Sequence, residues 1–233
     1  MDKAEFDKFA DEYRAMHKSS VAISGEDPEY FAEYKIADIA REYSRLRGEP
    51  SAPLNILDFG AGVGGSVPYV AKHFPDCVLR CIDPSERSLE IAKSRFPDAA
   101  TYLQFDGTTI PFADDSFDIA YAMCVFHHID ADQHVRLMGE LRRVLKPTGV
   151  LFIFEHNPYN PLTVRVVNDC PFDENAVLIP GKELARRLSQ AGFSKPDIHY
   201  RVFFPHFLAF LRPLEAVLHS LPLGGQYYAL SEK

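Results

Sequence analysis

The chain has 233 residues, of which 46% are hydrophobic, and its formal net charge at pH 7 is -8. A chain of this length buries roughly 70% of the surface that it exposes when unfolded, so one α/β domain can hold its core without disulfides. Affinity for nucleic acids comes mainly from neutralisation of phosphates by Lys and Arg, so the acidic balance predicts no nucleic-acid partner.

The N-terminus and the cysteines indicate the compartment. Residues 1–10 are acidic and amphipathic, without the basic start and apolar run of a signal peptide. The longest apolar runs are interrupted well short of the roughly 20 residues that a membrane span needs. We therefore expect a cytoplasmic protein without stable membrane insertion. Its cysteines form neither a Cys-x-x-Cys pair nor a zinc spacing, which indicates reduced thiols at Cys77, Cys81, Cys124 and Cys170.

Two helices are predicted at the start of the chain from apolar residues at helical spacing. The first covers about residues 6–17, and the second runs from about 29 to 46. A breaker-rich stretch of Gly and Pro follows at 48–53. We expect residues 1–53 to form an N-terminal helical cap and linker, and residues 54–233 to form the main, catalytic domain, with a helical insert at 205–225.

Apolar runs and helical segments alternate after residue 54. Strands are predicted at 55–59, 78–82, 101–105, 117–124 and 149–155, and helices at 67–73, 86–95, 131–144 and 181–191. This alternation, with nearly continuous apolar strands, predicts an α/β fold with a doubly wound, Rossmann-like parallel sheet. Two late strands, at 197–204 and 226–232, are expected to pair antiparallel at one edge. The sheet is therefore expected to be mostly parallel with an antiparallel last strand.

The most informative segment, residues 56–65, is a strand that ends in an acidic residue and leads through glycines into a helix. Glycine lets the backbone turn tightly and approach a ligand, and the N-terminus of the next helix favours an anionic group. This order predicts a nucleotide-type cofactor. Gly60, Gly62 and Gly65, with Asp83 at a suitable distance behind them, satisfy the dinucleotide fingerprint of a nicotinamide enzyme.

The same segment also resembles motif I of the class I S-adenosylmethionine (SAM) dependent methyltransferases, through Asp58, Gly60, Gly62 and Gly64. Four further segments resemble that family in the expected order, at residues 81–85, 105–108, 110–118 and 141–151. The resemblance covers nearly the whole chain. A nicotinamide enzyme is not expected to carry the later segments together, so the chain is identified as a member of the methyltransferase family.

The resemblance implies SAM as the cofactor and S-adenosylhomocysteine as the product. Asp83 is expected to accept hydrogen bonds from both ribose hydroxyls, because a carboxylate is a strong bidentate acceptor. Asp106 would take the adenine amino group, and Asp58 would hold the glycine turn and act through water on the methionine amino group rather than touch the cofactor directly. Tyr13 either reaches the cofactor carboxylate or only packs. The expected cofactor-binding residues are Asp58, Gly60, Gly62, Gly64, Asp83, Pro84, Asp106, Gly107, Thr108, Cys124 and Tyr13.

Histidines near the ends of the fourth and fifth strands are the candidate bases, because an acceptor that carries a proton needs one and histidine titrates near neutrality. His127 and His128 leave the fourth strand at the carboxyl edge, where ligands lie in such sheets. The alternative is that one packs under the adenosine and the other caps the next helix. His156 follows the fifth strand in a loop, 155–161, that two prolines make rigid. We take His127 and His156 as the candidate catalytic residues.

A metal site is not expected here. Adjacent histidines on a turn rarely converge on one ion, and the family that the chain resembles usually needs none. The potential metal ligands considered for this expectation are His127, His128, Asp130, Asp132 and His134.

Residues 203–214 are rich in large apolar side chains. Four interpretations fit this insert: a lid over an apolar acceptor, a homodimer surface, an interfacial membrane contact and, the one we favour, a helix packed on the sheet. As a whole the sequence predicts a SAM-dependent methyltransferase that acts on a small, partly apolar molecule.

Two alternatives to this function stay open. An NAD(P)-dependent reductase would use the dinucleotide fingerprint, but no Tyr-x-x-x-Lys pair follows the fourth strand. A methyltransferase-like protein that only binds is the second alternative, although Asp58, Asp83 and Asp106 are all present.

Overall fold

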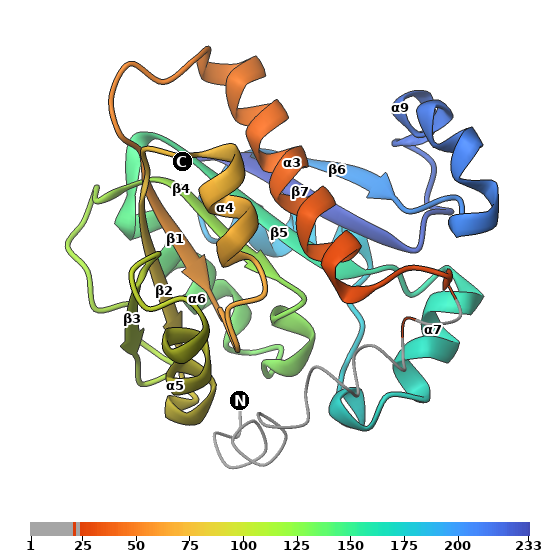
Figure 1. Ribbon diagram of the computed structural model, residues 1–233, viewed down its shortest axis with the longest axis horizontal. Coiled ribbons are helices and arrows are strands. Elements are labelled where there is room, and N and C mark those ends of the chain that lie inside the picture. The colour runs from red at the N-terminus through yellow and green to blue at the C-terminus, as the bar shows by residue number, and fades with distance from the viewer. Residues whose placement is uncertain (1–20, 22–23) are drawn as a thin grey trace.

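The computed structural model describes residue 21 and residues 24–233. Within this part of the chain, seven strands form one sheet in the order β3-β2-β1-β4-β5-β7-β6, with helices on both faces (Figure 1). The strands are β1 Asn55–Phe59, β2 Val78–Asp83, β3 Thr101–Gln104, β4 Phe117–Met123, β5 Leu145–His156, β6 Ser194–Arg201 and β7 Gln226–Glu232. The α-helices are α3 Pro28–Arg47, α4 Val67–His73, α5 Glu86–Arg95, α6 His134–Val144, α7 Pro161–Asn168, α8 Gly181–Gln190 and α9 Glu215–Leu218. Short 3-10 helices are η2 Phe126–His128, η3 Pro171–Asp173 and η4 His206–Leu214.

The strand directions confirm the predicted sheet. Strands β1 to β5 pair in parallel, whereas β7 pairs antiparallel with both β5 and β6. The chain order reverses between β1 and β4, which are neighbours in the sheet. In an open α/β sheet, ligands bind at the carboxyl ends of the strands where this reversal occurs. The topology therefore places the binding site at the ends of β1 and β4.

Side chains of the central strands alternate between two cores, as the period of two in a strand requires. In β1, Ile56 belongs to the core under α3 and α4, and Leu57 belongs to the core under α6 and α8. In β5 the same alternation separates Phe152 from Ile153. Figure 1 shows α3 and α4 side by side on one face and α6 on the other. Burial on both faces explains why the strands are nearly continuous apolar runs.

Helix α3 confirms the second predicted helix. It begins with Pro28 in its first turn and ends before Gly48, whose φ of 76° suits glycine. Phe31, Ile36 and Ile39 bury one side of it against the sheet. The first predicted helix, at 6–17, and Tyr13 lie outside the described residues. The boundary between a cap and a catalytic domain at residue 53 stays a prediction.

Helix α7 is an element that the sequence analysis did not predict. The rigid loop that was expected at 155–161 gives way to a helix at Pro161. The Asn160 side chain accepts hydrogen bonds from the backbone N–H groups of Leu162 and Thr163, at 3.1 Å each. An Asn at the N-cap followed by Pro is a helix-start signal, so the sequence did contain the information.

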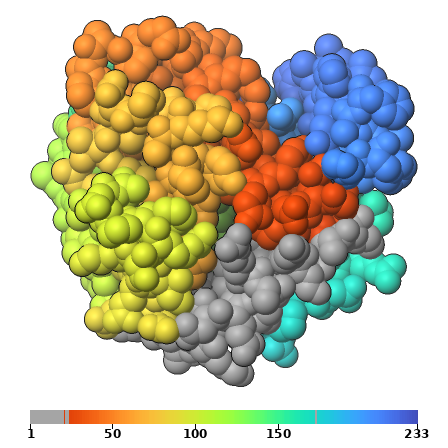
Figure 2. Space-filling view, viewed as in Figure 1, coloured from red at the N-terminus to blue at the C-terminus, as the bar shows by residue number. Residues whose placement is uncertain are grey.

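Phe203 packs against the main core, but the helix that follows it in the insert between β6 and β7 stays on the surface, so the favoured interpretation of residues 203–214 as a helix packed on the sheet was wrong. No residue of η4 is buried, and Phe207 and Phe210 are 76% and 75% exposed. The buried Glu215 of α9 holds the base of the insert by accepting the backbone N–H of Phe203 at 3.0 Å. Figure 2 shows the insert as a blue lobe at one corner of the molecule. Among the described residues, no helix is long and apolar enough to cross a membrane.

Candidate active site

A cavity of about 270 Å³ opens at the carboxyl ends of β1, β2, β4 and β5. The glycine turn after β1 lines one end, η2 and the end of β5 line the other, and residues from α3 and from the α7–η3 region complete the wall. The cavity brings together seven of the residues predicted to form the site: Asp58, Gly60, Gly62, Asp83, Cys124, His127 and His156.

Gly60 can only be a glycine for two independent reasons. Its φ of +77° lies in the left-handed region, which other residues adopt at a cost. A Cβ built on it would also lie 2.6 Å from Cγ2 of Val125. The backbone N–H groups of Gly60 and Ala61 both donate to the Ile82 carbonyl, at 2.9 and 3.1 Å, which ties the turn to the end of β2.

The third constrained glycine of the turn is Gly64 rather than Gly65. Gly64 has a φ of +76°, and a Cβ there would lie 3.0 Å from the Cβ of Ala92. At Gly65 no positive φ occurs and a Cβ would meet no atom within 4 Å. The dinucleotide fingerprint needs its third glycine for close packing of the helix on the strand. Gly65 makes no such contact, so the geometry favours the methyltransferase interpretation of this segment.

Asp83 joins the end of β2 to the glycine turn. Its Oδ2 accepts the backbone N–H of Gly62 at 2.9 Å, and its Oδ1 accepts the N–H of Ser85 at 2.9 Å. Ser85 in turn caps α5 by accepting the N–H of Ser88 at 3.0 Å. The carboxylate is thereby oriented on the wall of the cavity, where a ligand hydroxyl can reach it.

Asp58 is buried beneath the turn. Its Oδ2 accepts hydrogen bonds from the hydroxyls of Ser66, at 2.5 Å, and Tyr121, at 2.9 Å. Burial raises the pKa of Asp58 to about 7, and the nearby Asp83 acts in the same direction, against the two hydrogen bonds. A cationic group in the cavity would relieve this cost, which suits the predicted interaction, through water, with an amino group.

Five other predicted cofactor residues are not among the described residues that line the cavity: Gly64, Pro84, Asp106, Gly107 and Thr108. The exposed Asp106 closes its own turn, because its Oδ1 accepts the backbone N–H groups of Thr108 and Thr109 at 2.7 Å each. Its predicted contact with adenine stays a prediction.

Cys124 follows β4 with a φ of 58°, a conformation that is uncommon for a residue with a side chain. The Lys35 ammonium donates to its Sγ at 3.3 Å. Burial raises the pKa of Cys124, but Lys35 and His156 more than offset this and lower it to about 6. Lys35 was missed by the sequence analysis. A signal was present, since Lys35 lies four residues after Phe31 and four before Ile39, on the apolar face of α3.

His127 is held inside the protein by Glu155. Its Nδ1 lies 2.5 Å from Oε2 of Glu155, and both side chains are fully buried. Glu155 Oε1 also accepts the backbone N–H of Phe126 at 2.8 Å. Burial opposes a charge on His127, but Glu155 and Asp173 raise its pKa to about 10. The imidazole is therefore charged at neutral pH, a state that does not suit a general base.

His156 lies beside His127, with ring centroids 5.3 Å apart, and is partly exposed on the cavity wall. Its Nδ1 is 3.4 Å from Nε2 of Gln226, whose side-chain oxygen accepts the hydroxyl of Tyr34. Of the two candidate bases, His156 has the position that an acceptor can reach.

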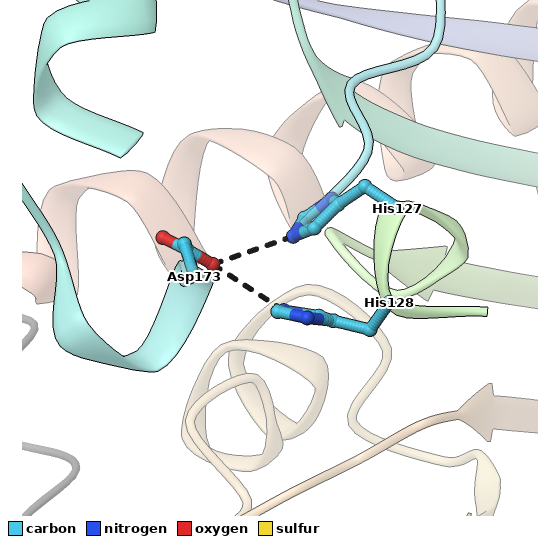
Figure 3. Close-up of side chains that lie close together, drawn as sticks. All are labelled: His127, His128 and Asp173. Atoms are coloured by element: carbon cyan, nitrogen blue, oxygen red, sulfur yellow. Dashed lines mark ion pairs between the residues drawn. The ribbon is translucent and has the colours of Figure 1, made fainter. Parts of the chain in front are cut away.

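Asp173 completes the far end of the cavity. Helix η3 brings its Oδ1 to 3.5 Å from Nε2 of His127 and 3.3 Å from Nε2 of His128 (Figure 3). No motif pointed to Asp173, which is distant in sequence from the histidines. His134 faces elsewhere, because its Nε2 is 2.9 Å from the Ile129 carbonyl.

The fold and this site match known proteins. Residues 57–153 match the family described as a methyltransferase domain. An uncharacterized methyltransferase of Mycolicibacterium vanbaalenii is 32% identical over 122 residues, which cover 51% of this chain and 46% of that protein. Methyltransferase GfsG of Streptomyces halstedii is 34% identical over 117 residues, which cover 48% and 40%. The crystal structure of a SAM-dependent methyltransferase of Thermotoga maritima, described as a possible histamine N-methyltransferase, superimposes with a TM-score of 0.66 at 19% identity, covering 99% of this chain and 98% of that one.

Residues 57–153 thus match a methyltransferase domain, and the chain has the fold of solved SAM-dependent methyltransferases, in agreement with the family resemblance seen in the sequence. The chain spans less than half the length of the two curated relatives named above. The matched methyltransferase domain contains the glycine turn and most of the segment from β1 to β5.

Proposed function

We propose that this protein transfers a methyl group from SAM to a small-molecule acceptor. The observation that carries the proposal is a continuous cavity that runs from the glycine turn to the histidine cluster. Methyl transfer from a sulfonium is an in-line displacement, so acceptor and methyl group must be held collinear at near-attack distance. One cavity with a cofactor end and an acceptor end meets that requirement.

At the cofactor end, Asp83 is assigned to the ribose hydroxyls and Asp58 to the cationic amino group of the cofactor. Asp83 is oriented by its bonds to the turn, and Asp58 lies where a positive charge lowers the cost of its burial. The backbone at Gly60 and Gly62 comes close to the ligand because no side chain intervenes.

At the acceptor end, we assign the base to His156 and a positioning role to His127. His156 is the accessible histidine of the two, whereas His127 is locked by Glu155. The walls of the cavity include the apolar side chains of Phe31, Met123 and Val166, which suit a partly apolar acceptor. All four cysteines are in the reduced thiol form, which supports a reducing compartment, so we place the protein in the cytoplasm.

Calorimetric titration with S-adenosylhomocysteine tests the cofactor. We expect micromolar binding, which Asp83→Ala weakens by roughly a hundredfold because it removes both the bidentate acceptor and the bond that holds Gly62. Asp76→Ala, at an exposed carboxylate, is the matched control and should bind normally. Binding of NADH instead would restore the dinucleotide interpretation. If the folded protein bound neither ligand, the result would favour the other alternative, a methyltransferase-like protein without SAM-dependent activity.

We also propose that the exposed insert forms the contact between two copies of the chain. Its large apolar side chains are exposed on one lobe, an arrangement typical of association surfaces. Sedimentation velocity should show a dimer, and Phe207→Gln with Phe210→Gln should shift it to a monomer. A parent protein that stays monomeric and instead sediments with anionic lipid vesicles would contradict the dimer and favour a membrane contact.

A further inference from the structure

We propose that His127, His128 and Asp173 bind a divalent transition-metal ion of the zinc type on the wall of the cavity. One potential ligand atom from each residue lies within 4.8 Å of the other two. Figure 3 shows both imidazoles, from consecutive positions of η2, directed at the Asp173 carboxylate of η3. This donor set, two nitrogens and one oxygen, is one that zinc takes in proteins.

The spacing of these atoms fits ligands around an ion better than a direct ion pair. Asp173 Oδ1 is 3.5 Å from Nε2 of His127 and 3.3 Å from Nε2 of His128. A charge-assisted N–H···O bond is shorter, about 2.7–2.9 Å. Around a tetrahedral zinc ion with bonds near 2.0–2.1 Å, two ligand atoms are about 3.3 Å apart. The two separations measured from Asp173 are close to two edges of such a tetrahedron.

An independent observation is the state of His127 Nε2. This atom is buried and has no hydrogen-bond partner among the described residues, while the side chain is fully buried. Because Nδ1 is fixed by Glu155, Nε2 is the nitrogen that faces Asp173 and the cavity. Asp173 Oδ1, at 3.5 Å, is too far for a good hydrogen bond, so the Nε2–H of the charged imidazole is poorly satisfied. A coordinated ion would displace this proton and remove the cost of burying it without a close acceptor.

Glu155 supplies the support that metal-binding histidines usually have. A histidine ligand almost always donates its other ring N–H to a carboxylate or carbonyl, which fixes the ring and makes it a stronger ligand. Here Glu155 accepts from Nδ1 of His127 and is itself anchored by the backbone N–H of Phe126. The carboxylate, imidazole and expected ion position are thus in the order found at zinc sites.

Three protein ligands leave a fourth position open, as catalytic rather than structural zinc sites do. All three ligands line the cavity, so this position faces the space assigned to the acceptor. An acceptor oxygen or nitrogen bound there would be polarised and held in place. This role rests on the proposed methyl transfer, whereas ion binding itself does not. The sequence-based expectation of no metal assumed that His127 and His128 diverge, and η2 instead directs both at Asp173.

The test is calorimetric titration of the metal-stripped full chain with Zn²⁺, with Mg²⁺ in parallel. We expect one Zn²⁺ per chain and no Mg²⁺ binding, since Mg²⁺ prefers oxygen ligands. Asp173→Asn should weaken Zn²⁺ binding by more than about tenfold, and Glu155→Gln by about ten- to a hundredfold. Asp169→Asn, at a nearby carboxylate that is 71% exposed, is the matched control and should bind like the parent.

Several results would overturn the site. The parent chain is expected to bind Zn²⁺ at this site, so a failure of the parent to bind, or equal binding by Asp173→Asn and Asp169→Asn, removes the proposal. Circular dichroism shows that each variant is folded before titration. The visible spectrum of the Co²⁺ form gives a second readout: a thiolate charge-transfer band would assign the ion to Cys124 or Cys170 instead. Binding of S-adenosylhomocysteine is measured separately, so failure of the proposed function and failure of the metal site are distinguishable.

Discussion

Replacing Gly60 by alanine is expected to lower the free energy of unfolding by roughly 3 kcal/mol, the sum of left-handed strain and of overpacking. The strain arises because φ at this position is +77°, and the overpacking because the new Cβ would lie 2.6 Å from Val125. Urea denaturation measures the loss. Binding of S-adenosylhomocysteine should fall with it, since the turn forms one wall of the cavity.

Neighbouring glycines provide the controls for this experiment. Gly62→Ala introduces left-handed strain without overpacking and should lower the free energy of unfolding by about 1 kcal/mol. Gly65→Ala introduces neither effect, so its free energy of unfolding should stay within about 0.5 kcal/mol of that of the parent. Adding Val125→Ala to Gly60→Ala removes the close contact, so the two changes should show a favourable coupling energy. A cost at Gly65 equal to that at Gly60 would contradict the assignment of the motif.

The features that were predictable from sequence are those that local physical chemistry determines. The strand, glycine and helix order at residues 55–73 needs only apolar periodicity and left-handed glycines, so β1 and α4 were predicted with their observed bounds. The pairing of β6 with β7 also followed from the pattern. By contrast, a single glycine pattern could not separate Gly64 from Gly65. That choice depends on Ala92 of α5, which only the folded structure brings close.

The acceptor end of the site depends on tertiary contacts that no spacing in the sequence records. Lys35 reaches Cys124 from α3, and Asp173 reaches His127 from η3. Each of these pairs joins segments far apart in the chain. Sequence reasoning placed His127 correctly at the carboxyl edge of the sheet, but its protonation is determined by Glu155, whose orientation follows from strand pairing between β4 and β5. The position of a candidate base can therefore be predicted from the sequence, whereas its protonation state cannot.

The insert shows the limit of hydrophobicity as a guide to burial. The segment that contains Phe207 and Phe210 has the apolar composition of a packed helix. However, η4 is a kinked 3-10 segment with non-helical geometry at Leu208 and with Pro213 inside it. Such a segment has no continuous apolar stripe to press against the sheet. The same side chains consequently remain on the surface.

Asp58→Asn is expected to stabilise the ligand-free protein and to weaken cofactor binding at the same time. Folding raises the pKa of Asp58 from 3.8 to about 7, so the folded protein holds this proton more tightly than the unfolded chain does. The carboxyl therefore costs stability above about pH 7, by an amount of the order of 4 kcal/mol, and the cost disappears as the pH falls toward 4. An asparagine accepts the same hydroxyls without the charge.

Chemical denaturation of both proteins between pH 4 and pH 8 measures this effect. The stability difference between Asp58→Asn and the parent should be small at pH 4 and should grow in favour of the variant up to about pH 7, where it levels off. Asp76→Asn, at an exposed carboxylate, should show no such pH dependence. A difference that is constant across this range would show that burial does not raise the pKa of Asp58.

Cofactor binding should change in the opposite direction. If the carboxylate contacts the cationic amino group of SAM, Asp58→Asn loses a charge-assisted interaction, and affinity for S-adenosylhomocysteine at pH 8 should fall by roughly ten- to a hundredfold. Unchanged affinity would assign Asp58 only to the support of the turn through Ser66 and Tyr121. A variant that gains stability while it loses affinity would show that the protein retains a buried carboxylate, at a cost to its own folding, because the cofactor requires it.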